Sequence, residues 1–336
     1  MNNTPLVSIL IPVYNVEKYI ERCARSLFEQ TYENLEYVFV DDGSTDDSIA
    51  IITKVVSEYP NRESHVQIFS FPENKGLPTA RNFLVDNCQT DWLIHVDADD
   101  WIEYDLVEEL VKKQQETGAE MVFSGLVYHK PNFDDSRRFL DSDQKSNFLQ
   151  CLFTDGSWVH IWGILISHSL YTENNIRVST KNKYAEDLRV IYRLMCFAKR
   201  ISGTKKDGYH YEWNNPNSLS IVNSRKVLER GLGVMNALEE VRSFVIQKMP
   251  EYVELYDKRI FMGLCNHFLE LSFIYSNKEL HRITSKNHRA IINRYPSSNS
   301  SGFMDQVKRE IKYHYWLTHS LYKYKGLTKK SSNTMR

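Results

Sequence analysis

Three carboxylates fall within four residues of the sequence, at Asp97, Asp99 and Asp100. They directly follow an apolar run, residues 92–96, that is typical of a buried strand. In an open parallel α/β sheet, ligands bind at the carboxyl ends of the strands. Crowded carboxylates repel one another unless a cation joins them, and a hard divalent cation carrying phosphate oxygens meets this need. Taken alone, the three residues fit a helix-capping turn as well.

Polar loops also follow the other predicted strands. Pro12 and Tyr14 follow the first strand, and Asp41 follows the second. Asn74 and, two helical turns later, Arg81 follow the third. All of these loops would share one edge of the sheet with residues 97–100, which we call the acidic segment. A nucleoside diphosphate needs from such an edge a stacking face for its base, acceptors for the base N–H and the ribose hydroxyls, and positive charge for its phosphates.

The residues at this edge can meet those needs. Tyr14 offers the stacking face, Asp41 the base acceptor and Asp97 the ribose acceptor, whereas Arg81 and a metal ion on Asp99 would neutralise the phosphates. Each residue alone also fits a plain role as a turn, a helix cap or a solvated charge. It is improbable that all the plain roles hold together at one edge, so the set predicts a nucleotide site.

Strands and helices alternate through the first third of the chain, with short loops between them. This alternation implies right-handed crossovers and a mostly parallel sheet, so the predicted fold class is α/β. The predicted strands cover residues 6–11, 35–40, 66–71, 92–96 and 120–125. The predicted helices cover residues 16–30, about 49–56, 76–88 and 102–115.

The later part of the chain is organised differently. From about residue 224 the apolar spacing is helical almost throughout, and residues 308–336 are strongly basic. We predict one domain over residues 1–222, a nucleotide-binding half at about 1–125, a second half at about 126–222, and a helical region with a basic tail over 223–336.

Composition excludes several classes of protein. The 336 residues carry a net charge of −1, which argues against nucleic acid as a partner. The five cysteines are scattered without a CxxC pair, which argues against a zinc site or a disulfide framework and fits a reducing cytosol. No signal peptide or membrane-spanning segment is evident, so a cytoplasmic location is expected.

Several motifs in a fixed order resemble the family 2 glycosyltransferases of the GT-A fold. The resemblance is close over residues 5–125 and looser to about 220. The matching segments are residues 7–15 (VSILIPVYN), 30–36 (QTYENLE), 40–46 (VDDGSTD), 74–76 (NKG), 80–82 (ARN) and 96–100 (VDADD). Any one of these motifs is weak, but their order makes the signal specific.

The resemblance implies a fold and a chemistry. The GT-A fold is a Rossmann-like, mixed but mostly parallel sheet flanked by helices, followed here by a helical C-terminal extension. Family members move a sugar, such as a hexosyl or hexosaminyl group, from a nucleotide sugar, usually a UDP-sugar, to a hydroxyl with inversion. Asp41 would contact the base, Asp97 the ribose, and Asp99 would bind Mg²⁺ or Mn²⁺ at the diphosphate. Pro12 and Asn74 fall in the donor-binding motifs.

Inversion in one displacement needs a general base opposite the leaving group. Glu186 and Asp187 open a predicted helix over residues 184–198. In the family an aspartate of such a pair serves as the base, so Asp187 is the predicted base and Glu186 an acceptor-side residue. The plain alternative is a pair of carboxylates favoured by the helix dipole.

Two further residues are predicted on the acceptor side. Trp162 falls where the family places acceptor-side aromatics, although its apolar neighbours fit core packing equally well. His210 falls where related sequences close over the phosphates, and the alternative is a surface or packing histidine. His95 is expected to be structural, and Asp100 to order its loop or the following helix start.

The wider role is expected from the family. The acceptor would be a glycan or a lipid-linked glycan in bacterial cell-envelope polysaccharide assembly. The basic tail, rich in Tyr and Trp, could lie on an anionic membrane at the inner face of the cytoplasmic membrane, or could close the C-terminal core or a homo-oligomer interface. The alternatives are a catalytically inactive nucleotide-binding module and, with less support, a nucleotidyltransferase, since no Gly-rich phosphate loop follows the first strand.

Overall fold

The computed structural model describes residues 4–129, 136–138, 140–154, 159–180, 184–213, 215, 227–260 and 263. The chain divides into two units, one of residues 1–221 and 243–250, and the other of residues 222–242 and 251–336. The predicted basic tail and most of the predicted C-terminal helices lie outside the described residues.

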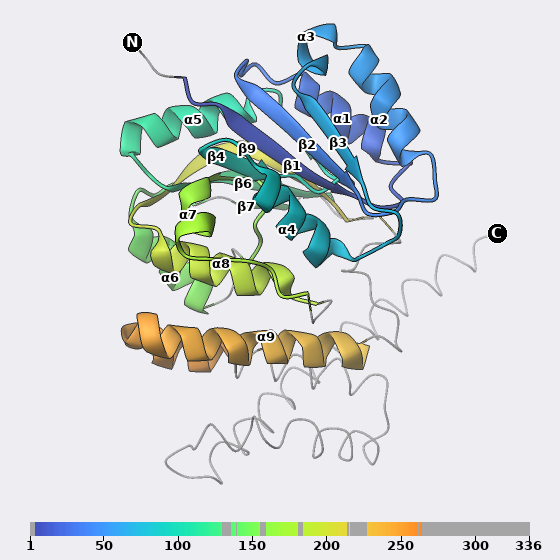
Figure 1. The fold of residues 1–336 in the computed structure, drawn as a ribbon. Helices are drawn as coiled ribbons and strands as arrows, with labels where there is room; N and C mark the ends of the chain where they lie inside the picture. Colours follow the sequence, from blue (N-terminus) through green and yellow to red (C-terminus); the bar gives the residue numbers. More distant parts are fainter. Residues whose placement is uncertain are drawn as a thin grey trace, which may run out of the picture. The chain divides into compact units, whose positions relative to one another are not determined.

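A mixed sheet forms the centre of the first unit (Figure 1). The strands are β1 (Val7–Val13), β2 (Leu35–Asp41), β3 (Val66–Ser70), β4 (Trp92–His95), β5 (Trp101–Ile102), β6 (Met121–His129), β7 (Ser136–Arg138), β8 (Ile164–Ser167) and β9 (Ile201–Glu212). Their order is β3-β2-β1-β4-β8-β6-β9-β5, and β7 pairs with β6. The strands β3, β2, β1 and β4 are parallel, β8 is antiparallel to both of its neighbours, and β6 and β9 are parallel.

Helices cover both faces of the parallel strands. The helices of the first half are α1 (Ile20–Phe28), α2 (Ser48–Ser57), α3 (Pro60–Glu63), α4 (Leu77–Asn87) and α5 (Leu106–Thr117). Those that follow are α6 (Lys145–Thr154), α7 (His168–Glu173), α8 (Glu186–Phe197) and α9 (Val227–Lys248). The chain moves outward from β1 to β3 and then back to β4, so right-handed crossovers place α4 on the face opposite α1 and α2. Figure 1 shows α4 in front of these strands.

The core explains why the parallel strands are apolar. Every residue of β1 is buried, as expected where helices cover both faces of a parallel sheet. In α1, Ile20, Cys23 and Leu27 lie on one buried face at helical spacing. The carboxyl ends of β1, β2 and β4 therefore open toward one edge of the sheet.

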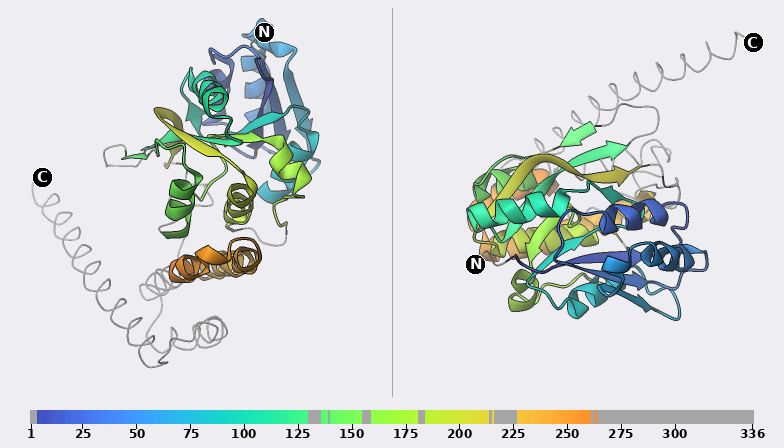
Figure 2. Two further views of the ribbon diagram at one scale, coloured as in Figure 1. Left: turned by 90° about the vertical axis from the view of Figure 1, so that its left-hand side faces the viewer. Right: turned by 90° about the horizontal axis from the view of Figure 1, so that it is seen from above.

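The predicted strands β1 to β4 and β6 are all present, but β5, β7, β8 and β9 were not predicted. The longest of these, β9, pairs with both β6 and β5. Its register against β6 shifts near Gly125, and the strand bends along its length (Figure 2). Close to the bulge, a Cβ at Gly125 would lie 2.5 Å from the Lys206 carbonyl oxygen, so only glycine fits there.

The second unit is helical in its described part. Arg242 of α9 pairs with Asp257 at 2.7 Å between Nε and Oδ1, and the Tyr256 hydroxyl donates to the Leu238 carbonyl at 2.9 Å. These contacts pack the helical residues 253–260 against α9. None of the helices in the described ranges is both long enough and apolar enough to cross a membrane.

Candidate active site

A cavity of about 870 Å³ opens at the carboxyl-end edge of the sheet. Its walls come from the loops after β1, β2, β3 and β4, the first turns of α4 and α8, and the end of β9. The polar and aromatic residues that line it include Pro12, Tyr14, Asp42, Asn74, Lys75, Arg81, Asp97, Asp99, Tyr128, His160, Trp162, Glu186, Asp187, Tyr211, Trp213 and Asn215. The structure thus brings most of the predicted site residues together.

The loops on the donor side are tied to one another. The Ser44 hydroxyl accepts from the Asn15 N–H at 3.2 Å, and the Asn15 side chain accepts from the Thr45 N–H at 2.8 Å. The Asp42 carboxylate accepts from the N–H groups of Lys75 and Gly76 at 2.6 and 2.8 Å. These bonds join the loops after β1, β2 and β3 into one wall.

Asp41 lies differently from its neighbour Asp42. The Asp41 carboxylate is buried, accepts from the Ser44 N–H at 2.8 Å, and does not line the cavity. Asp42 does line it. At Gly43, φ is +72° and a Cβ would lie 2.6 Å from the Glu73 carbonyl carbon, so glycine is required where these loops meet.

Asp100 orders the acidic segment through buried hydrogen bonds to β9. Its carboxylate is fully buried and accepts from the Tyr209 hydroxyl at 2.6 Å and the Glu212 N–H at 2.8 Å. The same Tyr209 hydroxyl accepts from the Asp97 N–H at 3.1 Å. Burial raises the pKa of Asp100 well above its usual range. Asp100 thus orders the loop, as expected, and leaves Asp97 and Asp99 at the cavity.

Asp99, the predicted metal ligand, lines the cavity with a crowded carboxylate. Burial, with the charge of Asp97, raises the pKa of Asp99 to about 6, and its Oδ2 accepts from the Asn215 amide at 2.8 Å. A nearby cation would relieve this repulsion. Within the described ranges, no three His, Cys, Asp or Glu residues cluster as a metal site. The chain offers carboxylate oxygens to a cation whose other ligands would be phosphate and water, the usual arrangement for Mg²⁺.

Arg81 joins the donor side to the predicted base. Its guanidinium is 1% exposed, and Nη2 donates to the Asp97 carboxylate at 2.9 Å. Nη1 donates to Glu186 at 3.3 Å and to Asp187. Burial lowers the pKa of Arg81, but the charges of Asp97 and Glu186 raise it more, so the guanidinium stays protonated. These contacts place its nitrogens on carboxylates rather than toward free space for phosphates.

An aromatic wall lies beside the acidic segment, since Trp162 pairs with His95 and the Glu212 N–H donates to Asp100. Trp162 stacks on Tyr211 with ring centroids 5.3 Å apart, and on His160 at 4.1 Å. Tyr211 also contacts Trp213 edge-on at 5.9 Å. Trp213 is 41% exposed and lines the cavity.

His210 does not line the cavity, in contrast to its predicted place. Side chains alternate along a strand, so His210 faces away from the side that Tyr211 presents. Its Nε2 lies 2.8 Å from Glu103 Oε1, its Nδ1 lies 2.9 Å from His129 Nε2, and its ring stacks on Trp101. The histidine is thus held in a packed cluster behind β9.

Seven of the polar and aromatic residues that line the cavity were not predicted as site residues. They are Asp42, Lys75, Tyr128, His160, Tyr211, Trp213 and Asn215. A period-two pattern, Tyr209-x-Tyr211-x-Trp213, could have indicated the aromatic wall. Asp42 lies beside the predicted Asp41, and sequence alone did not decide which of the two faces the cavity.

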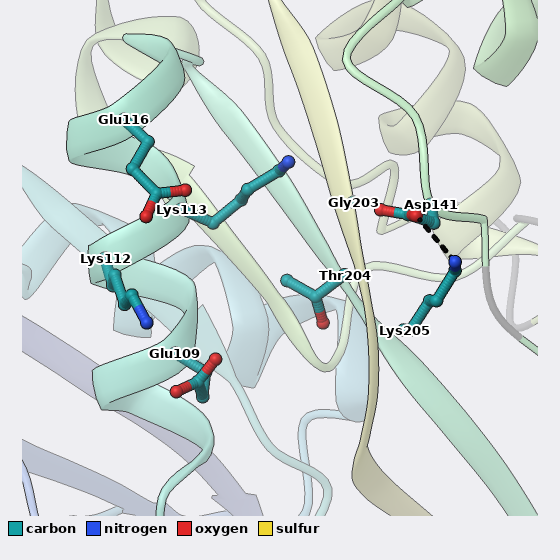
Figure 3. A pocket seen from close by; sticks show the side chains of 8 residues that line it. All are labelled: Glu109, Lys112, Lys113, Glu116, Asp141, Gly203, Thr204 and Lys205. Carbon is teal, nitrogen blue, oxygen red and sulfur yellow. Dashed lines mark ion pairs between the residues drawn. The ribbon is translucent and has the colours of Figure 1, made fainter.

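A smaller hollow of about 200 Å³ lies between α5 and β9 (Figure 3). Its lining carries charges of both signs, including Lys112, Lys113 and Glu116 of α5. Lys205 pairs with Asp141 across it at 3.2 Å, as the dashed line in Figure 3 marks. The hollow shares no residue with the large cavity.

Comparison with known proteins identifies the family. The sequence profile of glycosyl transferase family 2 matches residues 8–181, which is more than half of the chain. The chain belongs to glycosyltransferase family 2. The matched range includes the loops after β1 to β4 and the acidic segment, whereas Glu186, Asp187 and the cavity residues at the end of β9 lie beyond it.

Curated relatives of this glycosyltransferase match to different extents. EpsH of Bacillus subtilis (strain 168), named as a glycosyltransferase, is 29% identical over 74% of this chain and 72% of its own length. Chondroitin synthase of Escherichia coli is 40% identical over 32% of this chain and 15% of its own length. The chain therefore spans a small part of the long synthase and most of EpsH.

Solved structures share the fold. S. aureus TarS 1–349 in complex with UDP-GlcNAc has a TM-score of 0.61 at 20% identity, over 78% of this chain and 72% of that one. Mannosyltransferase PcManGT from Pyrobaculum calidifontis, in complex with GDP-Man and Mn²⁺, has a TM-score of 0.58 at 15% identity, over 96% and 85%. The predicted GT-A fold, with a mostly parallel sheet flanked by helices and a helical C-terminal part, is confirmed.

Proposed function

We propose that this glycosyltransferase moves a sugar from a nucleotide sugar, most simply a UDP-sugar, to a glycan hydroxyl with inversion. The observation that carries the proposal is the arrangement of Asp97, Asp99, Arg81 and Asp187 around one cavity. A volume of about 870 Å³ leaves room for a donor and part of an acceptor.

The donor would lie against the wall formed by the loops after β1, β2 and β3. Its base would stack on Tyr14, with Asp42 beside the base and the buried Asp41 ordering the loop after β2 through the Ser44 N–H. The ribose would meet Asp97. Lys75, which lines the same wall, adds positive charge toward the diphosphate. The TarS complex with UDP-GlcNAc supports a uridine donor, and the PcManGT complex shows that this fold also takes GDP-mannose.

Asp187 is the proposed general base. The acceptor oxygen attacks the anomeric carbon, and its proton passes to the Asp187 carboxylate. The bond between the anomeric carbon and the diphosphate oxygen breaks, and the nucleoside diphosphate leaves with the electron pair. Because attack and departure occur on opposite faces of the sugar, the anomeric configuration inverts. The Arg81 guanidinium donates a hydrogen bond to this carboxylate.

Asp99 would hold Mg²⁺ or Mn²⁺, with Asn215 orienting the carboxylate through its amide. A bound divalent ion would neutralise charge on the departing diphosphate. The PcManGT complex, which contains Mn²⁺, supports this choice of cofactor.

The acceptor would lie against the aromatic wall of Trp162, Tyr211 and Trp213. An aromatic face packs well on the C–H face of a sugar ring while leaving the hydroxyls in water. The match to chondroitin synthase supports a role in polysaccharide synthesis, and we propose bacterial cell-envelope glycans, free or lipid-linked, as acceptors. Peripheral membrane contact through the basic tail and homo-oligomer formation remain proposals about residues outside the described ranges.

An inactive nucleotide-binding module is the remaining alternative, since a nucleotidyltransferase does not agree with the family. The test incubates the full chain with UDP-glucose, UDP-GlcNAc, UDP-galactose, GDP-mannose and dTDP-rhamnose, with Mn²⁺ or with EDTA. Binding is measured by calorimetry and nucleoside diphosphate release by chromatography. We expect one donor class to bind and to be slowly hydrolysed in Mn²⁺. If a nucleotide sugar binds but no nucleoside diphosphate is released, the result favours the inactive module. If no nucleotide sugar binds, the result contradicts both the glycosyltransferase and the inactive nucleotide-binding module.

A further inference from the structure

The backbone is strained immediately before the proposed base. Helix α8 begins at Glu186, and Ala185 just before it has φ 57° and ψ 38°, in the left-handed region. A residue with a Cβ pays about 1–2 kcal/mol to adopt this conformation. No side chain at the N-cap position hydrogen-bonds to the first turn of α8. Another group must therefore stabilise the turn that aims Asp187 into the cavity.

Arg189 is placed to do this. Its side chain is fully buried, and Nη1 donates to the carbonyl oxygens of Tyr184 at 3.0 Å and of Ala185 at 3.2 Å. These two carbonyls belong to the peptide groups on either side of the left-handed residue. Because a buried guanidinium is stable only when it is hydrogen-bonded, both the cation and the turn gain from these bonds.

Asp187 is thus held from two directions. Arg81 of α4 holds its carboxylate, and Arg189 of α8 holds the backbone from which its side chain starts. The two arginines are the largest fully buried side chains among the described residues, but their places differ. Arg81 lines the cavity, whereas Arg189 does not.

We propose that Arg189 is a positioning residue that fixes the left-handed turn at Ala185 and so sets the direction of the Asp187 carboxylate. This inference rests on the proposed role of Asp187 as base. Displacing a base by about 1 Å costs on the order of 100-fold in rate while the donor wall after β1 to β3 is untouched. The predicted signature is a loss of kcat without a loss of donor affinity.

Two pairs of variants test the proposal. Arg189→Met removes the donors to both carbonyls, and Arg189→Lys keeps one charged donor of similar reach. Ala185→Val disfavours the left-handed conformation because valine is β-branched, and Ala185→Gly tolerates it freely. Each full-length variant is assayed for hydrolysis and binding of the tightest-binding nucleotide sugar from the five-member panel, and its thermal unfolding is recorded.

The expected result is a fall in kcat of about tenfold or more for Arg189→Met and Ala185→Val. Donor Kd should stay within about twofold, Ala185→Gly should keep the wild-type kcat, and Arg189→Lys should recover part of it. If Arg189→Met does not fold, the Ala185 pair decides alone. Wild-type kcat in Ala185→Val, or a loss of donor affinity as large as the loss of kcat, would overturn the proposal.

Asp187→Asn separates this inference from the function on which it rests. If Asp187→Asn loses turnover and the Arg189 and Ala185 variants do not, the positioning role alone is wrong. If Asp187→Asn turns over donor at the wild-type rate, Asp187 is not the base, and the positioning role is wrong together with the proposed mechanism.

Discussion

The guanidinium of Arg81, on α4, is hydrogen-bonded to the carboxylate of Asp187, on α8, across 106 positions of the sequence. The other end of the same guanidinium holds Asp97 at 2.9 Å. One buried cation therefore joins the proposed ribose site to the proposed base. This relationship makes Arg81 a structural link as well as a charge in the cavity.

Replacing Arg81 by methionine should destabilise the fold. The change leaves the carboxylates of Asp97, Glu186 and Asp187 without their shared cation, and breaking a buried pair costs about 3–5 kcal/mol. Urea unfolding measures the loss. The matched control is Arg25→Met, whose guanidinium pairs with Glu21 and Glu58 at the surface, so its loss should lower the free energy of unfolding much less. Equal losses of unfolding free energy in Arg81→Met and Arg25→Met would show that Arg81 is not a structural link between α4 and α8.

Replacing Asp99 by asparagine should remove the effect of Mn²⁺. In the presence of UDP, Mn²⁺ should raise the melting temperature of the wild type, since a ligand at 100 times its Kd stabilises by about 2.7 kcal/mol. The variant should show no such rise, because the carboxylate is gone. Asp86→Asn, whose carboxylate pairs with Arg177 at the surface, is the control and should keep the rise. If Mn²⁺ raised the melting temperature of Asp99→Asn as much as that of the wild type, Asp99 would not be a metal ligand.

His95 should make the fold sensitive to acid. Burial, reinforced by the Arg81 charge, lowers the pKa of His95 to about 3, and its Nε2 lies 3.2 Å from the Tyr171 hydroxyl. The unfolded chain takes up a proton near pH 6.5 and the folded chain does not. Stability from this group is therefore complete above pH 6.5 and falls as the pH falls, by about 2 kcal/mol between pH 7 and pH 5.

The variant His95→Gln measures this contribution. Glutamine can still hydrogen-bond to the Tyr171 hydroxyl but does not titrate. The free energy of unfolding, measured in urea at pH 7, 6 and 5, should fall less steeply in the variant, by about 2 kcal/mol over that range. His65→Gln, at an exposed position, should follow the wild type. A variant slope equal to the wild-type slope would show that His95 does not carry the effect.

Trp213 should affect transfer and not hydrolysis. The donor and methyl glycosides of glucose, galactose and N-acetylglucosamine are incubated together, and the ratio of transfer to hydrolysis is measured. Trp213→Ala should lower that ratio about fivefold through the lost stacking surface, with little change in stability because the ring is 41% exposed. Tyr104→Ala, an exposed aromatic that does not line the cavity, is the control. An unchanged ratio of transfer to hydrolysis in Trp213→Ala would show that the acceptor does not stack on Trp213.

The sequence predicted the part of the fold that local pattern determines. The parallel strands β1 to β4 and the helices α1 and α4 are apolar at clear spacing, and their loops carry the motifs. The short strand β5 and the bulged β9 form through pairing with distant residues, such as Trp101 with His210, which local propensity does not reveal.

The same limit applies to the site. Which loops meet at the cavity followed from topology, because parallel strands end at the same edge. Topology did not predict which side chains of those loops face the cavity. Asp42 rather than Asp41 lines it, and His210 lies behind β9. The link from Arg81 to Asp187 depends on how α8 packs beside α4, so sequence alone assigned Arg81 to the phosphates instead.

The most direct test of the account compares Asp187→Asn with the wild type for binding and hydrolysis of the preferred nucleotide sugar. The substitution keeps the size of the side chain but removes its ability to take a proton, together with the charge that pairs with Arg81. Asp187→Asn should bind the donor with a Kd within about twofold of wild type and turn it over about 100-fold more slowly, or slower still. Turnover at the wild-type rate with unchanged donor binding would contradict the role of Asp187 as base.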